Sequence, residues 1–267
     1  MTAPNVVFFK KTFAPARPCP SLVTFPLIEP SSEKIKQMKD KFSVINFVNM
    51  DKIFQSGSII PASDNPFKFK SKEFDLPETY VFEDSNQNLM DALDYYETDG
   101  LLILKNETIL YENYWHNNNQ ASQHISWSVA KSFLSALIGI AIERGQIDSI
   151  NDPITKYLSD FTNTGYNNVS IKNLLQMSSG IKFNEDYADY NSDINRFGRT
   201  ISFGTSMREF AKTLENEKPQ GTYNHYVSID TQMLAMLLQE VTGKTITDNL
   251  KDDICLLYTS DAPDERS

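Results

Sequence analysis

The chain of 267 residues contains two cysteines, Cys19 and Cys255, and three histidines, His116, His124 and His225. Two cysteines cannot form the disulfide framework that stabilises many small secreted domains. The three histidines share no spacing typical of a zinc site. The sequence also contains neither a P-loop nor a G-x-G-x-x-G string. We therefore expect a protein that uses neither a metal ion nor a nucleotide cofactor.

Long apolar runs and excess positive charge are missing too. No stretch approaches the roughly 18 apolar residues that a membrane span needs. Acidic residues outnumber basic ones by 35 to 25, which gives a formal net charge of −10 and disfavours nucleic acid and anionic membranes as partners. The apolar patch in the first twenty residues is too short and too rich in proline for a signal peptide. These patterns predict a globular protein located in the cytoplasm.

What the chain does contain is enough apolar material for a sizeable core, because 40% of its residues are hydrophobic. Residues 14–30 hold five of the twelve prolines and read as an extended arm, and residues 31–42 read as a polar surface helix. We treat 1–44 as one N-terminal segment. Residues 43–86 are expected to be irregular.

From residue 86 onward the pattern alternates between β-rich runs and helical periodicity. The region between Leu175 and Met207 includes a polar loop, expected over 182–206. Strands precede a block of helices, so the predicted class is α+β. The expected elements are a helix at 86–100 ended by Gly100, a hairpin at 100–115, helices at 125–145, 170–180 (stopped by Gly180) and 206–217, and a helix at 226–244 ended by Gly243.

The helix at 125–145 contains a chemical oddity. Residues 133–142 are apolar or small on every side, as in a buried helix, yet Lys131 stands near its beginning, three residues after Ser128. On a helix these two side chains share a face, and a desolvated lysine can take the proton of a serine hydroxyl. This is the S-x-x-K arrangement. The plain alternative is a lysine whose stem covers the core while its head reaches water.

The motif alone is weakly specific, because Ser31 and Lys34 match it in a solvated, charged stretch. Another arrangement of a catalytic serine is disfavoured: the string nearest to G-x-S-x-G is GTSMR at 204–208, which lacks the second glycine. His225 neighbours Tyr226, so in an extended segment it points the other way. We interpret His225 as a surface or packing residue.

Three longer segments carry a family resemblance. ISWSVAKSFLSALIGIAIERGQIDSINDPITKYL, IKNLLQMSSGIKFNEDYADYNSD and GTYNHYVSIDTQMLAMLLQEVTGK occur in this order. They resemble the nucleophile helix, the L-L-x-M-S-S-G segment with its E-D-Y-x-D loop, and the second catalytic motif of class C type β-lactamase-related serine hydrolases. Within that family, the carboxylesterases and 6-aminohexanoate-oligomer hydrolases are the most similar. The resemblance covers roughly residues 45–254.

Applied residue by residue, the resemblance implies that Ser128 is the nucleophile, Lys131 its proton partner, and Tyr226 the phenol that passes the proton to the leaving group. Ser228 stands where many relatives have asparagine, which leaves its hydrogen-bonding role open. Tyr187 matches the tyrosine of the E-D-Y-x-D loop, which borders the substrate cleft in the nylon-oligomer branch. The alternatives are a core aromatic at Tyr226 and a surface tyrosine at Tyr187.

The resemblance further implies a β-lactamase/penicillin-binding-protein-like fold and hydrolysis of a small carboxylic ester or linear amide through an acyl-enzyme. It implies no cofactor. A β-lactamase or penicillin-binding enzyme with the same chemistry, or a non-catalytic relative that keeps the fold for binding, are the alternatives.

The last expectation concerns residues 255–267. The family's third motif, a Lys/His-Thr/Ser-Gly strand that lines the cleft, does not follow the helix at 226–244. The string CLLYTSDA is also encoded by the sequence of a transposase-based sequencing adapter. We therefore interpret the hydrolase domain over 45–254 as truncated, 255–267 as a non-native tail, and the sequence as a metagenomic fragment. Such a chain is expected to be poorly soluble and nearly inactive, because one lost oxyanion donor costs about 10²–10³ in rate.

Overall fold

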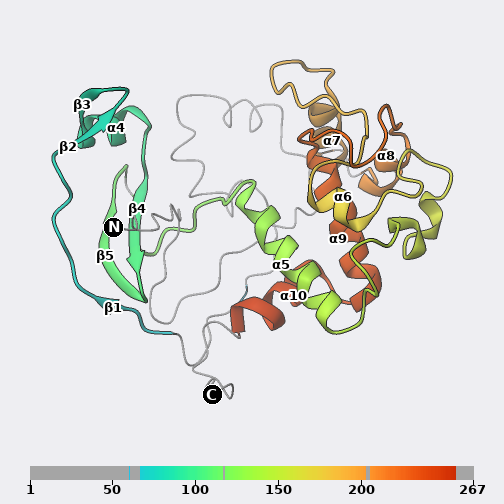
Figure 1. The fold of residues 1–267 in the computed structure, drawn as a ribbon, viewed down its shortest axis with the longest axis horizontal. Coiled ribbons are helices and arrows are strands. Elements are labelled where there is room, and N and C mark those ends of the chain that lie inside the picture. Colours follow the sequence, from blue (N-terminus) through green and yellow to red (C-terminus); the bar gives the residue numbers. More distant parts are fainter. Residues whose placement is uncertain (1–59, 61–66, 117, 203–204, 257–267) are drawn as a thin grey trace.

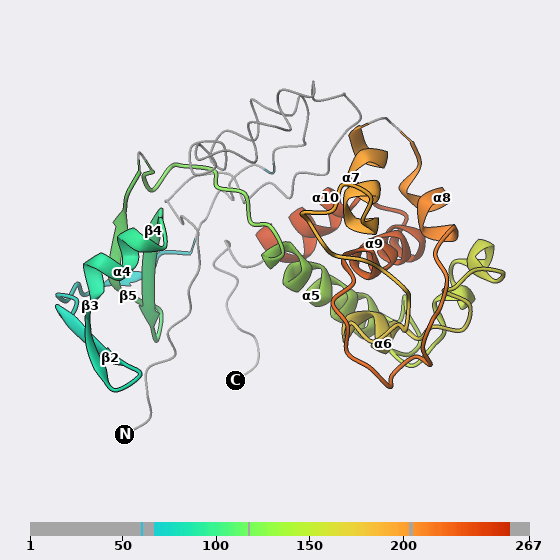
Figure 2. The ribbon, with the colours of Figure 1, turned by 90° about the horizontal axis from the view of Figure 1, so that it is seen from above.

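The computed structural model describes residues 60, 67–116, 118–202 and 205–256. The expected arm, the surface helix at 31–42 and nearly all of the expected tail lie outside these residues. Figures 1 and 2 place the strands and the helix α4 at one end of the molecule and the other helices at the opposite end. In chain order the elements are β1 Lys70–Ser71, β2 Thr79–Phe82, β3 Ser85–Asn88, α4 Leu89–Tyr95, β4 Gly100–Lys105, β5 Thr108–Tyr114, α5 Val129–Glu143, η1 Ile154–Lys156, η2 Ser159–Phe161, α6 Ile171–Leu175, α7 Asp193–Ser202, α8 Met207–Lys212, α9 Ser228–Thr242, α10 Ile246–Leu250 and η3 Lys251–Cys255.

The expected hairpin is confirmed as β4 and β5. The two strands pair antiparallel, and β1 adds to β5 in parallel. Asn106 and Glu107 both have positive φ, at 48° and 58°, as a two-residue turn of type I′ requires. The KNET string therefore reverses the chain within two residues.

Two expectations for the region before β4 are wrong. Residues 79–88 were expected to be largely irregular, but β2 and β3 form a second hairpin. The helix α4 ends at Tyr95, and Gly100 begins β4 instead of ending the helix. A Cβ at Gly100 would lie 3.0 Å from Tyr114 Cδ1, so the glycine at this position serves strand pairing, not helix termination.

The core lies in the helical block, where α5 packs against α9 (Figure 1). Both helices have apolar residues at helical spacing, and burying such a stripe is what stabilises a helix in a protein. Gly243 ends α9 in the left-handed conformation, with φ at 64°, which confirms the expected stop. The largest fully buried side chains include Tyr166, Phe161, Leu137, Ile138, Ile171, Leu174 and Ile229.

One face of α5 differs from expectation. Leu134, Leu137, Ile138 and Ala141 are buried, but the face that carries Ser132, Ser135, Ala136 and Gly139 is exposed. Those residues are small, so they read as compatible with burial on every side. Composition alone does not distinguish a helix face that other residues cover from an exposed face made of small residues.

Two further helices differ from the expected boundaries. The helix expected at 170–180 is short: α6 ends at Leu175, and an irregular segment follows before Gly180. The expected loop at 182–206 contains α7, whose Ile194 and Phe197 pack against the core. Ile194 and Phe197 have helical spacing, but the interior Gly198 and the polar residues around them made the segment resemble a loop.

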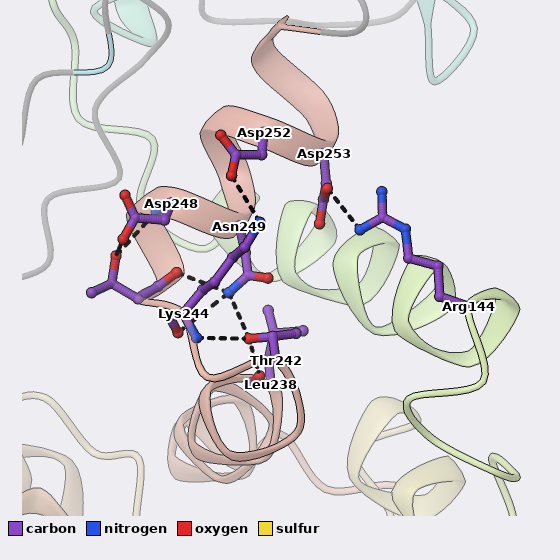
Figure 3. Close-up of polar contacts among 9 residues, drawn as sticks. Arg144, Leu238, Thr242, Lys244, Asp248, Asn249, Asp252 and Asp253 are labelled. Atoms are coloured by element: carbon purple, nitrogen blue, oxygen red, sulfur yellow. Dashed lines mark hydrogen bonds and ion pairs between the residues drawn. The ribbon is translucent and has the colours of Figure 1, made fainter.

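Polar contacts fix the last described helices on α5 and α9 (Figure 3). Arg144, at the end of α5, forms an ion pair of 2.8 Å with the buried Asp253 in η3. Asn249 donates to the Oγ1 of Thr242 at the end of α9 and to the carbonyl of Thr245 just before α10. This block therefore has its own polar attachment besides apolar packing.

Candidate active site

The site begins where α5 begins. Ser128 is the residue immediately before the helix, and it is exposed. Lys131 lies one turn further and is half-buried. Its Nζ donates a hydrogen bond of 3.0 Å to Ser128 Oγ. Lys131, expected at the start of a buried helix, therefore lies at the exposed end of α5, where its ammonium group contacts the hydroxyl of Ser128.

Tyr226 reaches the same oxygen from the other side. Its hydroxyl donates to Ser128 Oγ over 2.8 Å, and Lys131 Nζ lies 5.3 Å from the centre of its ring. Burial favours the neutral phenol, but the hydrogen bond with Ser128 and the adjacent Lys131 ammonium outweigh it, so the pKa of Tyr226 is lowered. The geometry thus gathers a hydroxyl, an ammonium and an acidified phenol.

Both ring nitrogens of His124, in the segment that precedes Ser128, make polar contacts. His124 Nε2 lies 2.5 Å from Oδ2 of the buried Asp99, next to β4, and its Nδ1 lies 2.8 Å from the carbonyl oxygen of Ile125. Trp127 has φ at 43°, a strained value for a bulky residue. Strain of this kind is retained where the surroundings fix the backbone.

The position of Tyr226 depends on the chain just before α9. The amide of Gly221 donates to Ser178 O and that of His225 to Met177 O, each over 2.8 Å. The segment at 221–225 is therefore laid along the one at 176–182, and Tyr226 follows directly. His225 Nε2 contacts the carbonyl oxygen of Phe183 at 2.9 Å, which agrees with the packing role expected for it.

Ser228 and Tyr187 lie beside this centre, together with a residue that the sequence reading missed. Glu185 accepts a hydrogen bond from the amide of Ser228, at the start of α9. Tyr187 is 62% exposed. Partial burial and the Glu185 charge raise its pKa, and the neighbouring Ser228 side chain opposes that rise. The E-D-Y string was the available signal for Glu185, but only its tyrosine was singled out.

Within the described part of the chain, no group of three or more His, Cys, Asp and Glu side chains is arranged to hold a metal ion. No helix in that part is both long enough and apolar enough to traverse a lipid bilayer.

A family model described as Beta-lactamase matches residues 87–259, more than half of the chain. The chain belongs to the beta-lactamase family. This match confirms the predicted family, and the structural comparison that follows supports the predicted fold class. The matched span contains Ser128, Lys131 and Tyr226.

The chain is similar to a curated protein in sequence and to a solved structure in fold. A 6-aminohexanoate-dimer hydrolase of Paenarthrobacter ureafaciens is 30% identical over 153 residues, which are 55% of this chain and 38% of that protein. The solved structure of a Bacillus anthracis protein with the provisional name 6-aminohexanoate-dimer hydrolase superposes with a TM-score of 0.72 at 20% identity. That match covers 85% of this chain and 62% of the other. The chain thus spans less than two thirds of the length of either relative.

Proposed function

We propose that Ser128 is the nucleophile of a serine hydrolase that cleaves carboxylic esters or linear amides through an acyl-enzyme. The observation that supports this is the meeting of three groups on one oxygen: Lys131 Nζ at 3.0 Å and Tyr226 OH at 2.8 Å from Ser128 Oγ. A serine hydroxyl becomes a useful nucleophile when a neighbouring base takes its proton. The exposure of Ser128 leaves it open to a substrate.

The proton path follows from the charges. A nearby ammonium stabilises phenolate, and phenolate can accept the serine proton while Ser128 Oγ forms a bond to the substrate carbonyl carbon. The protonated Tyr226 then returns that proton to the leaving oxygen or nitrogen as its bond to carbon breaks. Water repeats the sequence on the acyl-enzyme and releases the acid.

The developing oxyanion needs hydrogen-bond donors. Within the described residues the backbone N–H of Ser128 makes no backbone hydrogen bond, so it is available to the substrate oxygen. Removing one donor of this kind typically costs about 10²–10³ in rate. The second donor is expected from a strand, as the family resemblance implies.

The substrate class is proposed from the relatives and from the groups at the rim. Both relatives carry the name 6-aminohexanoate-dimer hydrolase, which favours a linear amide or an ester over a β-lactam. Tyr187, Ser228 and Glu185 lie next to Tyr226, where they would border a bound small molecule. A β-lactamase or penicillin-binding activity and a non-catalytic binding role are the competing functions.

The test is covalent modification of Ser128 by a reagent whose phosphorus atom an activated serine attacks with loss of fluoride, because attack by the same oxygen begins the proposed turnover. The chain is treated with a fluorophosphonate, and the modified residue is located by peptide mass spectrometry. We expect a single adduct on Ser128 that is absent from Ser128→Ala. Labelling of Ser132→Ala, on the exposed face of the same helix, should equal that of the parent chain. Equal labelling of Ser128→Ala and the parent would refute the assignment.

The same readout separates the competing functions. The chain is incubated with a p-nitrophenyl acyl ester, a linear 6-aminohexanoate dimer or a cephalosporin before the fluorophosphonate is added. The proposed function predicts protection by the ester or the dimer, with the acyl mass on Ser128. Protection by the cephalosporin alone would favour the β-lactamase reading, and no adduct from any reagent would favour a binding protein.

A further inference from the structure

Asp230, Tyr166 and Ser179 form a buried polar cluster at the start of α9, close to Tyr226 in the chain. These residues take no part in the reaction proposed above. Asp230 and Tyr166 have no exposed surface, and Ser179 is 1% exposed. Tyr166 OH donates to Asp230 Oδ1 over 3.0 Å. Burying a carboxyl group is costly unless its oxygens are satisfied or the group is neutral. Such a cluster therefore needs an explanation.

The two oxygens of Asp230 differ. Oδ1 accepts from Tyr166, whereas Oδ2 is buried and makes no hydrogen bond with any described residue. The side chain of Ser179 lies close enough to influence the carboxyl group. A proton on Oδ2 would remove the charge and turn this unsatisfied acceptor into a donor. The surroundings of Asp230 thus suit a carboxylic acid better than a carboxylate.

The cluster connects the two parts of the chain that flank Tyr226, the first turn of α9 and the segment at 176–182. Asp230 lies in the first turn of α9, and its amide donates to Val227 O over 3.0 Å. Ser179 belongs to the segment at 176–182, whose carbonyls hold the chain at 221–225. Tyr226 lies between these two parts. A change in the distance between Asp230 and Ser179 is therefore passed to the phenol at the nucleophile.

We propose that Asp230 is a positioning residue, which in its protonated form fixes the first turn of α9 against the 176–182 segment and so keeps the Tyr226 hydroxyl on Ser128. This inference rests on the proposed function of Ser128 and Tyr226, but the buried cluster can be tested without it. The cluster makes the site sensitive to pH through a group that never touches the substrate.

The direction of that sensitivity follows from the carboxyl group. Burial raises the pKa of Asp230 to about 7, against the opposing effects of Ser179 and Tyr166. Tyr166 is the titratable group that faces it, and burial followed by the Asp230 charge raises the pKa of its phenol, so it stays a neutral donor. A carboxyl pKa that is higher in the folded state stabilises the fold at acid pH, and this stabilisation is lost as pH rises through about 7.

The first experiment compares Asp230→Asn with the parent chain. The amide oxygen can accept from Tyr166 and the amide is neutral with N–H donors at every pH, so it imitates the protonated acid. Fluorophosphonate labelling of Ser128 is measured from about pH 5.5 to about pH 8.5. The ratio of the variant rate to the parent rate cancels any pH dependence that the two proteins share. We expect a ratio near one at acid pH that increases by about fivefold or more above the carboxyl pKa.

Hydrogen–deuterium exchange provides a readout that does not depend on Ser128 chemistry. The amides of Gly221 and His225, which report the hold on the Tyr226 segment, should exchange faster in the parent than in Asp230→Asn above about pH 7 and equally below it. Asp230→Leu removes the contacts and should lose protection of both amides at all pH values, whereas Tyr166→Phe should lose it in part.

The outcomes separate the two proposals. If Ser128→Ala labels like the parent, the proposed function fails, and the exchange ratio still decides the role of Asp230. If labelling is specific for Ser128 but both the rate ratio and the exchange ratio for Asp230→Asn stay flat across the pH range, Asp230 is not a pH-dependent positioning residue. A rising ratio in either readout supports the inference.

Discussion

The hydroxyl of Tyr226 donates a 2.8 Å hydrogen bond to Ser128 Oγ, although 98 positions separate the two residues in the chain. The contact is made by the turn before α9 reaching the first residue before α5. The packing of α5 on α9 in the core is what brings these two helix starts together. The candidate site is therefore supported by the packed core of the helical block.

Removing the phenolic oxygen should disable the nucleophile without disturbing the fold. Tyr226→Phe keeps the ring but deletes the group that accepts and returns the proton. We expect Ser128 labelling to slow by about 10²–10⁴, the usual worth of acid–base assistance. Tyr223→Phe, a half-exposed ring three residues away, is the matched control and should label at the parent rate. Similar rates in the two variants would contradict the role given to Tyr226.

Replacing Lys131 by arginine tests whether this lysine exchanges a proton or only supplies charge. Arginine keeps the positive charge but does not deprotonate in proteins. We expect Lys131→Arg to be nearly unreactive toward the fluorophosphonate while its thermal unfolding stays close to that of the parent. An Arg variant that labels normally would show that the residue serves as a fixed cation.

The Glu185 carboxylate is expected to set the pH range of the reaction. After partial burial, its charge is the next cause of the raised pKa of Tyr187, and it opposes the lowering of the pKa of Tyr226 by Ser128 and Lys131. In Glu185→Gln the pKa of Tyr226 should fall further below its usual value near 10, so labelling should rise with pH at a lower pH than in the parent. An unchanged or higher apparent pKa would count against the electrostatic role of Glu185.

The sequence was informative where a local pattern carries the chemistry. The spacing of Ser128 and Lys131 on a helix and the place of Tyr226 before an apolar helix were both readable, and the structure brings the three side chains together. The KNET turn was readable too, because a short polar string with Asn106, a residue that tolerates positive φ, separates two β-rich runs. In each of these cases a short stretch of chain determines the geometry.

Other features could not be read because they depend on distant packing. Glu185 joins the site only because its loop folds back onto the amide of Ser228, a contact across 43 positions. The exposed side of α5 has the same small residues that a buried side would have. Asp230 resembles an ordinary acidic residue in the first turn of a helix, and its burial comes from Tyr166 and Ser179, which lie far away in sequence.

The ion pair between Arg144 and Asp253 should contribute to stability more than its neighbour (Figure 3). The Asp253 side chain is 8% exposed, whereas Lys244 and Asp252, which pair at 2.9 Å, are both well exposed. Arg144→Ala leaves a buried carboxylate unpaired and should cost about 1–2 kcal/mol, since the arginine itself is partly solvated. Lys244→Ala, the matched control, should cost less than about 0.5 kcal/mol. Urea unfolding measures both, and equal losses would contradict this assignment.

Two glycines should respond to alanine in opposite directions. Gly180 has φ at +79°, and a Cβ there would lie 2.0 Å from the carbonyl oxygen of Lys218. Alanine must therefore push apart the segments that hold Tyr226, and Gly180→Ala should lower both stability and the rate of Ser128 labelling. Gly139 lies within α5 and an added Cβ meets nothing within 4 Å. Gly139→Ala should thus stabilise the chain by about 0.5–1 kcal/mol through helix propensity, with labelling unchanged. Thermal unfolding and labelling of the two variants side by side test this, and a tolerated Gly180→Ala would mean that the 176–182 segment does not fix Tyr226.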